Sequence, residues 1–145
     1  MMGFGRKRYV ADASVILKWF SRAGEGEMEK AIQLREDYSK GTIELYAPEL
    51  LIYEIANVLS YKGTLKEELI SKALASIYDM DILMPVNLQI MTTAVRFARK
   101  FGITVYDSCY LSFAMEAGGH LITADKTSLR KIKGVPGILY IGDYE

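Results

Sequence analysis

Four acidic residues lie within or directly after apolar runs, where a lone carboxylate is unusual. Asp12, Asp107 and Asp125 each close a short apolar run, and Glu54 lies inside the apolar segment 50–59. A carboxylate in such surroundings costs desolvation free energy unless it is paired, hydrogen-bonded or bound to a metal ion. Carboxylate oxygens are ligands that Mg²⁺ and Mn²⁺ prefer. The four acids together therefore predict one site that binds Mg²⁺ or Mn²⁺.

Each of the three aspartates also has a purely structural interpretation. Asp12, Asp107 and Asp125 each stand where a helix could begin, and Asp is favoured at helix N-caps. The two roles are compatible, because one carboxylate oxygen can cap a helix while the other binds a metal ion.

Glu54 has a different alternative, a position at the rim of the core from which its carboxylate reaches solvent. Its helical neighbours are Leu50, Leu51 and Val58, with one amide at Asn57. A mainly apolar face with a single amide favours an acid directed into a site and supported by Asn57.

Hydroxyl groups and basic side chains accompany these acids. Ser14 and Thr123 lie two residues from Asp12 and Asp125, so their hydroxyls could orient a carboxylate or a water molecule, although Ser14 also suits a helix start. Tyr106 and Tyr110 are interpreted as core residues with a solvated hydroxyl. Three cations after Asp125 could contact phosphates or form solvated surface: Lys126, Arg130 and Lys131.

The composition predicts one globular domain over residues 1–145, with a core at about 9–142. A formal net charge of zero excludes binding to nucleic acid through bulk charge, but local basic patches remain open. The chain has one cysteine and one histidine, which excludes a Cys/His zinc site. With no signal-peptide pattern and no apolar run long enough to span a membrane, we expect a soluble, cytoplasmic protein.

Strands alternate with helices along the chain, which predicts an α/β fold with a mostly parallel sheet flanked by helices. We expect strands at 9–11, 43–47, 82–84, 103–106, 121–123 and 138–141. We expect helices at 14–20, 27–39, 48–62, 66–78, 88–101, 108–117 and 127–132. Ligands of such sheets bind outside the carboxyl ends of the strands. This edge is where the strand pattern places Asp12, Asp107 and Asp125.

Four segments resemble, in order, the motifs of PIN-domain proteins. The run 9–20 resembles the opening motif, 54–59 the Glu motif, 106–110 the third motif and 123–125 the fourth. The length and the opening are most similar to the small VapC-type toxins of toxin–antitoxin pairs. The resemblance implies a metal-dependent ribonuclease that forms a homodimer and is inhibited by an antitoxin protein. It assigns the metal-binding acids to Asp12, Glu54, Asp107 and Asp125, an auxiliary hydroxyl to Ser14 and a supporting amide to Asn57.

One position departs from the family pattern. Many relatives carry a further acid two residues after the fourth, and here that residue is Thr127. The resemblance therefore leaves open whether the site holds one metal ion or two.

Two other functions fit part of the pattern. A phosphatase or receiver that phosphorylates an Asp needs a second acid near the first, and Ser14 occupies that position. A catalytically inactive PIN-like module that binds RNA or protein without cutting is the main alternative. The retained acids argue against it, because clustered carboxylates are costly in a site that has no use for them.

Overall fold

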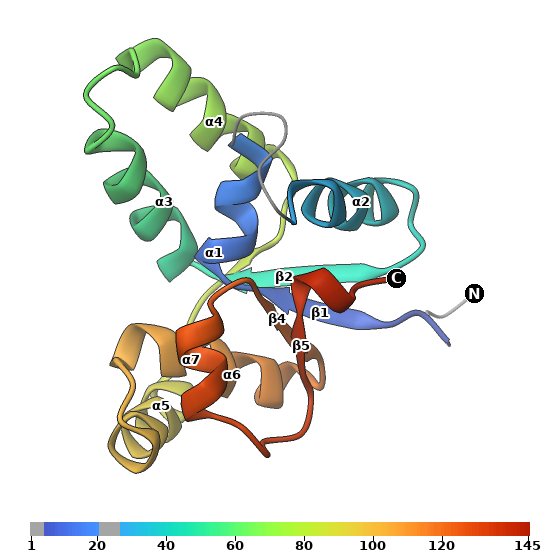
Figure 1. The fold of residues 1–145 in the computed structure, drawn as a ribbon, viewed down its shortest axis with the longest axis vertical. Helices are drawn as coiled ribbons and strands as arrows, with labels where there is room; N and C mark the ends of the chain where they lie inside the picture. Colours follow the sequence, from blue (N-terminus) through green and yellow to red (C-terminus); the bar gives the residue numbers. More distant parts are fainter. Residues whose placement is uncertain (1–4, 21–26) are drawn as a thin grey trace.

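The computed structural model describes residues 5–20 and 27–145, which form one α/β domain around a five-stranded sheet (Figure 1). The strands are β1 (Arg8–Ala11), β2 (Glu44–Pro48), β3 (Leu83–Met84), β4 (His120–Thr123) and β5 (Ile138–Tyr140). Their order across the sheet is β3-β2-β1-β4-β5, and every neighbouring pair is parallel. The predicted α/β class and the predicted parallel sheet are confirmed.

Seven α-helices and two 3₁₀ turns are found in the described residues. They are α1 (Ala13–Ile16), η1 (Leu17–Phe20), α2 (Met28–Ser39), α3 (Leu50–Ser60), α4 (Glu67–Asp79), α5 (Leu88–Phe101), α6 (Val105–Ala117), α7 (Lys126–Lys131) and η2 (Ile141–Asp143). In Figure 1, α1 to α4 lie in the upper half of the view, and α5 to α7 lie in the lower half. Within the described ranges, no helix is long and apolar enough to cross a membrane.

The predicted strand at 103–106 is wrong, and Asp107 therefore does not close a strand. Gly102, with φ of +67°, ends α5, and the chain turns at once into α6. Thr104 is the N-cap of α6, and its hydroxyl accepts a hydrogen bond of 3.0 Å from the Asp107 backbone N–H. The β-branched run 103–105 suggested a strand, but the capping bond and the packing of α6 on α5 decide for a helix. Asp107 lies in the first turn of α6, not at its cap.

Smaller differences concern the ends of the elements. Pro48 is the last residue of β2 instead of the first turn of the next helix, and the predicted helix 14–20 divides into α1 and η1. Gly24 and Gly26 follow the predicted helix 14–20, and glycines at these positions are expected to break it; both lie outside the described residues. These differences leave the order of strands and helices around the acids unchanged.

The central strand positions the first acid. Val10 and Ala11 of β1 are fully buried between β2 and β4. The backbone N–H of Asp12 donates to the Ile122 carbonyl at 3.3 Å, which continues the pairing with β4 one residue past β1. The Asp12 side chain is thereby held at the carboxyl edge of the sheet.

Candidate metal-binding site

Ser14 joins the ends of the two central strands. The Ser14 hydroxyl donates to Asp12 Oδ1 at 2.5 Å and lies 3.3 Å from Thr123 Oγ1 at the end of β4. It also accepts a bond of 2.8 Å from the backbone N–H of Ala124. Asp12 Oδ1 accepts a further bond of 3.3 Å from the Val15 N–H, as an N-cap does. Ser14 thus contacts the Asp12 carboxylate, and Asp12 is the N-cap of α1.

Ser128 links two of the acids, and the sequence interpretation missed it. Its hydroxyl lies 3.2 Å from Asp107 Oδ2 and 2.8 Å from Asp125 Oδ2. The single hydroxyl proton can serve only one of these oxygens at a time. Asp125 caps α7 through its other oxygen, which accepts from the backbone N–H groups of Thr127 at 3.0 Å and Ser128 at 3.2 Å. A serine three residues after a capping Asp was the signal available in the sequence.

Tyr110 holds the fourth acid. The Tyr110 ring is only 2% exposed, as a core residue, but its hydroxyl is not solvated as predicted. It donates to Glu54 Oε1 at 2.5 Å, across 56 residues of sequence. Burial raises the pKa of Tyr110 well above its ordinary value, and the nearby Glu54 carboxylate raises it further. Tyr110 is therefore a neutral donor that fixes one oxygen of Glu54.

The acids influence one another electrostatically. Burial raises the pKa of Asp12 from its ordinary 3.8 to about 6, and the negative charge of Asp107 adds to this rise. Hydrogen bonds from Ser14, Thr123 and Val15 oppose the rise. Burial and the Asp107 charge also raise the pKa of Glu54, against the Tyr110 bond. The charge of Asp107 raises the pKa of both Asp12 and Glu54, and the Ser128 hydroxyl contacts both Asp107 and Asp125. We call these four linked residues, Asp12, Glu54, Asp107 and Asp125, the acid cluster.

Asn57 stands apart from this network. Its side chain is exposed, about one helical turn along α3 from Glu54. Within the part of the chain that the structure describes, no hydrogen bond joins its amide to the acids. A support for Glu54 through Asn57 stays a prediction, and the partner observed for Glu54 is Tyr110.

The donor set fits a hard divalent cation. Among the described residues, no three Asp, Glu, His or Cys side chains already stand close enough together to hold a metal ion. Like-charged carboxylates repel one another, and Asp12 and Glu54 each direct one oxygen to a hydroxyl donor. A divalent cation would relieve the repulsion that Asp107 exerts on these two acids. The cluster supplies carboxylate and hydroxyl oxygens, which suit Mg²⁺ or Mn²⁺ better than zinc.

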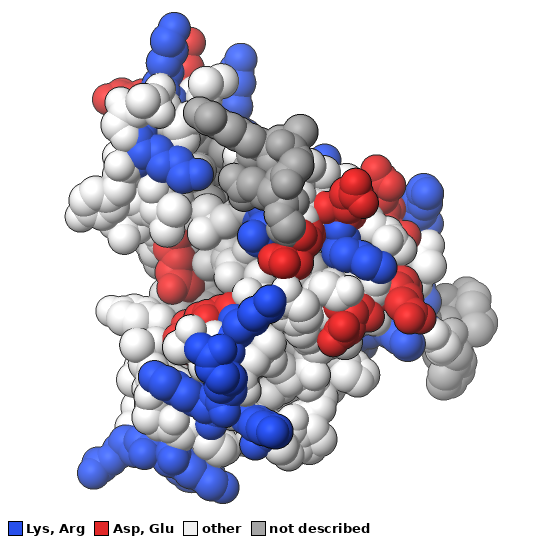
Figure 2. Space-filling model, in the orientation of Figure 1, with Lys and Arg blue, Asp and Glu red and all other residues white. Residues whose placement is uncertain are grey.

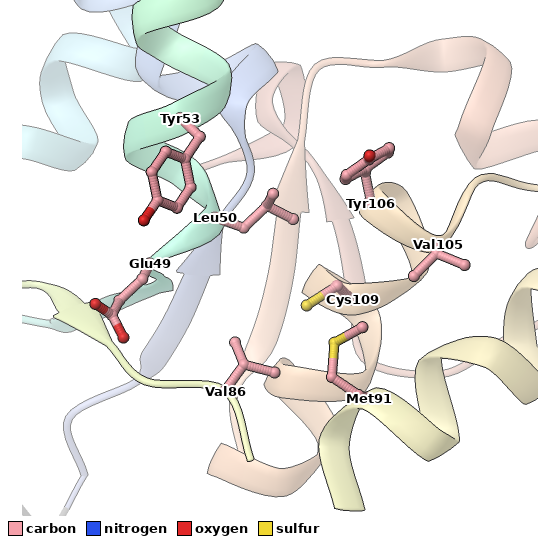
Figure 3. A pocket seen from close by; sticks show the side chains of 8 residues that line it. All are labelled: Glu49, Leu50, Tyr53, Val86, Met91, Val105, Tyr106 and Cys109. Atoms are coloured by element: carbon pink, nitrogen blue, oxygen red, sulfur yellow. The ribbon is translucent and has the colours of Figure 1, made fainter. Parts of the chain in front are cut away.

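A mainly apolar pocket of about 310 Å³ lies beside the cluster (Figure 3). Tyr53 of α3 and Tyr106 of α6 stand on opposite sides of it, and Cys109 and Met91 contribute sulfur atoms to its wall. Tyr53 and Tyr106 are 71% and 60% exposed and directly precede two of the acids. The interpretation of Tyr106 as a core residue is therefore wrong, since the first turn of α6 points it outward.

Comparisons with known proteins identify relatives of this chain. The PIN domain family model matches residues 9–135. The ribonuclease VapC3 of Pyrobaculum aerophilum is 29% identical over 130 residues, which cover 86% of this chain and 94% of the relative. The crystal structure of PAE2754 from the same organism covers 97% of this chain and 90% of its own, with a TM-score of 0.66 and 24% identity.

A more distant structure shares the same fold. DNA-bound VapBC from Salmonella typhimurium contains a chain that matches 92% of this one and 96% of its own length, with a TM-score of 0.67 and 12% identity. The family match spans most of the domain and includes all four acids. This chain belongs to the PIN-domain family.

Proposed function

We propose that the protein is a metal-dependent endoribonuclease and the toxin of a VapBC-type toxin–antitoxin pair. The observation that carries the proposal is the network that links the four acids: the Ser128 hydroxyl contacts Asp107 and Asp125, and the charge of Asp107 adds to the raised pKa of Asp12 and Glu54. A relative named as a ribonuclease, similar over most of both chains, supports RNA as the substrate.

The chain's own residues would hold and orient the metal. When bound, Mg²⁺ or Mn²⁺ would lower the pKa of a coordinated water and neutralise charge on the phosphate. We assign direct ligation to Asp12 and Asp107, and direct or water-mediated ligation to Glu54 and Asp125. Ser14 orients Asp12 through its hydrogen bond, with Thr123 beside it. Because water is the nucleophile, no protein nucleophile is needed, which suits a chain with a single histidine.

Removal of divalent metal is the direct test of this function. Purified, antitoxin-free protein is incubated with a structured RNA pool in Mn²⁺, in Mg²⁺ and in excess chelator. We expect cleavage with either metal and none with chelator, because the phosphate charge is then not neutralised. Cleavage that persists in chelator would contradict the metal-dependent mechanism. An RNA-binding protein that neither cleaves nor binds Mn²⁺ by calorimetry would be the inactive PIN-like module instead.

The Tyr110→Phe variant tests the positioning of Glu54. It removes only the hydroxyl that donates to Glu54 Oε1. Loss of a group that orients a metal ligand typically lowers metal affinity or activity about 10- to 100-fold. We expect a loss of this size in cleavage rate, with a higher Mn²⁺ concentration needed for half-maximal activity.

Tyr144→Phe is the matched control for this experiment. Tyr144 is also buried, and its hydroxyl also donates to a carboxylate, Asp37 Oδ2, at 2.5 Å, away from the acid cluster. It should lose similar stability and keep its cleavage rate. Equal rates for the two variants would show that Tyr110 has only a structural role.

The antitoxin would bind a second groove, which is also mainly apolar. A groove of about 360 Å³ between η1, α3 and α4 is lined mainly by apolar side chains: Phe20, Leu59, Leu65, Leu69, Ile70 and Ala73. Trp19 of η1 is held by α2, since its indole N–H donates to the Ala31 carbonyl at 2.7 Å. The toxin–antitoxin complex from Klebsiella pneumoniae, whose chain shares this fold, supports a protein partner.

A second copy of the chain would cover part of the face around the pocket of Figure 3. Val105, Tyr53 and Tyr106 are exposed there and offer apolar contact surface. We therefore retain the homodimer as part of the proposal. A cytoplasmic location, where a toxin of this kind would meet its RNA, is also part of it.

A further inference from the structure

Helix α7 connects the acid cluster to a group of cations. Ser128 contacts Asp107 and Asp125. Arg130 and Lys131, in the last turn of α7, are exposed. The Arg130 guanidinium donates to Thr127 Oγ1 at 3.3 Å, and the Thr127 backbone N–H donates to Asp125. The guanidinium thus lies back along α7 toward the residue that caps it.

The same helix reaches the end of α5. Lys131 Nζ donates to the carbonyl of Gly102, the residue that caps α5, at 3.3 Å. Arg99 and Lys100 are exposed in the last turn of α5. We call these four cations, Arg99, Lys100, Arg130 and Lys131, the basic track. In Figure 2, blue side chains cover the lower part of this face, over α7 and α5, below acidic side chains at the centre.

The charge of this region differs from that of the rest of the chain. Residues 88–133 contain seven Lys and Arg but three Asp and Glu, a net charge of +4 in a protein of net charge zero. Two of the three acids, Asp107 and Asp125, belong to the cluster. In the described ranges the ion pairs are Arg8–Glu44 and Lys18–Glu27, so the track cations are not engaged by carboxylates.

Lys126 is not part of the basic track, because its ammonium group contacts a side chain of β5. Its ammonium lies over the Tyr140 ring, 5.3 Å from the centroid, and it acts on the carboxyl of Glu27, whose pKa is lowered chiefly by a Tyr140 hydrogen bond. Lys100 also lies over a ring, with its ammonium 5.3 Å from the Phe101 centroid, but that ring belongs to α5 itself. The four track residues are therefore exposed cations in the last turns of α5 and α7.

We propose that the basic track binds the phosphates of the RNA strand next to the bond that the acid cluster cleaves. The proposal rests on the ribonuclease function above. The four carboxylates repel an approaching RNA strand, which is a polyanion. The cations of the basic track, in the last turns of α5 and α7, offset that repulsion. Contacts of this kind position the strand without reading its bases. The track therefore sets the path of the RNA, and sequence preference must come from other residues.

Salt dependence of RNA binding tests the track separately from catalysis. Labelled single-stranded RNA and duplex DNA of equal length are titrated with the non-cleaving Asp107→Asn protein in Mg²⁺, across a range of KCl concentrations, and followed by anisotropy. In this background we compare Arg130→Gln/Lys131→Gln and Arg99→Gln/Lys100→Gln with Lys40→Gln/Lys66→Gln. The last pair removes two exposed cations outside the track.

Each lost phosphate contact on a single strand should reduce the slope of log K against log salt by about 0.7. Each track pair should therefore reduce the slope by about 1.4. If the variant and its parent bind equally at 1 M salt, this change of slope weakens RNA binding by the variant about 25-fold at 0.1 M salt. The control pair should match its parent. Track variants that bind RNA like the control, or that lose only duplex DNA binding, would overturn the proposal.

The two proposals fail in different ways. If the wild-type protein cleaves RNA and Asp107→Asn does not, the ribonuclease stands, whatever the track variants show. If Asp107→Asn cleaves like the wild type, the assigned acid site is wrong. The track then no longer lies next to a known site of cleavage, and its proposed role fails as well.

Discussion

Replacement of Asp107 by Asn is expected to abolish metal-dependent RNA cleavage and leave the fold intact. Asp107 raises the pKa of both Asp12 and Glu54 through its charge, and it shares Ser128 with Asp125. Its side chain caps no helix, since Thr104 is the cap of α6. Asn keeps the size and an oxygen that can accept from Ser128, but it removes the negative charge.

The expected loss of cleavage rate is on the order of 10³-fold, equivalent to about 4 kcal/mol of transition-state stabilisation. Initial rates on the RNA pool measure it, and far-UV circular dichroism with thermal unfolding checks the fold. Asp79→Asn is the matched control, because Asp79 is an exposed acid at the end of α4. A cleavage rate for Asp107→Asn within twofold of this control would exclude Asp107 as a ligand.

Replacement of Asp12 by Asn should stabilise the metal-free protein at high pH. The pKa of Asp12 is about 6 in the folded protein, against an ordinary value of 3.8. The folded state therefore binds this proton more tightly than the unfolded state does. Stability is lost as the pH rises from about 4 through 6, and the loss then levels off. A difference of about two pKa units corresponds to at most about 3 kcal/mol at pH 8.

Asn at position 12 avoids this loss, because it is neutral and keeps an oxygen that can accept from Ser14 and Val15. Urea unfolding in chelator at pH 4 and pH 8 gives the measurement. The variant should exceed the wild type by up to about 3 kcal/mol at pH 8 and by much less at pH 4. Saturating Mn²⁺ should stabilise the wild type more than the variant. A variant no more stable than the wild type at pH 8 would contradict the destabilising charge assigned to Asp12.

The sequence by itself determined the α/β class and most of the elements. The alternation of apolar strands and amphipathic helices specifies a parallel sheet, and the strand pattern placed Asp12 and Asp125 correctly just after the carboxyl ends of β1 and β4. The helix 88–101 was predicted to the residue, because apolar periodicity and the glycine cap at Gly102 are local signals. The four acids stand out in the sequence because their neighbours are apolar, and Ser14 stands out because it lies two residues from Asp12.

The tertiary structure alone decided which groups act on those acids. Asp107 lies in the first turn of α6, since a capping threonine and packing on α5 outweigh the strand preference of the residues before it. Tyr110 reaches Glu54 across 56 residues, and Ser128 reaches Asp107 across 21. Contacts between distant segments follow from how helices pack on the sheet, and no local pattern encodes that packing. For the same reason only the folded chain shows that the cations of α5 and α7 lie together beside the site.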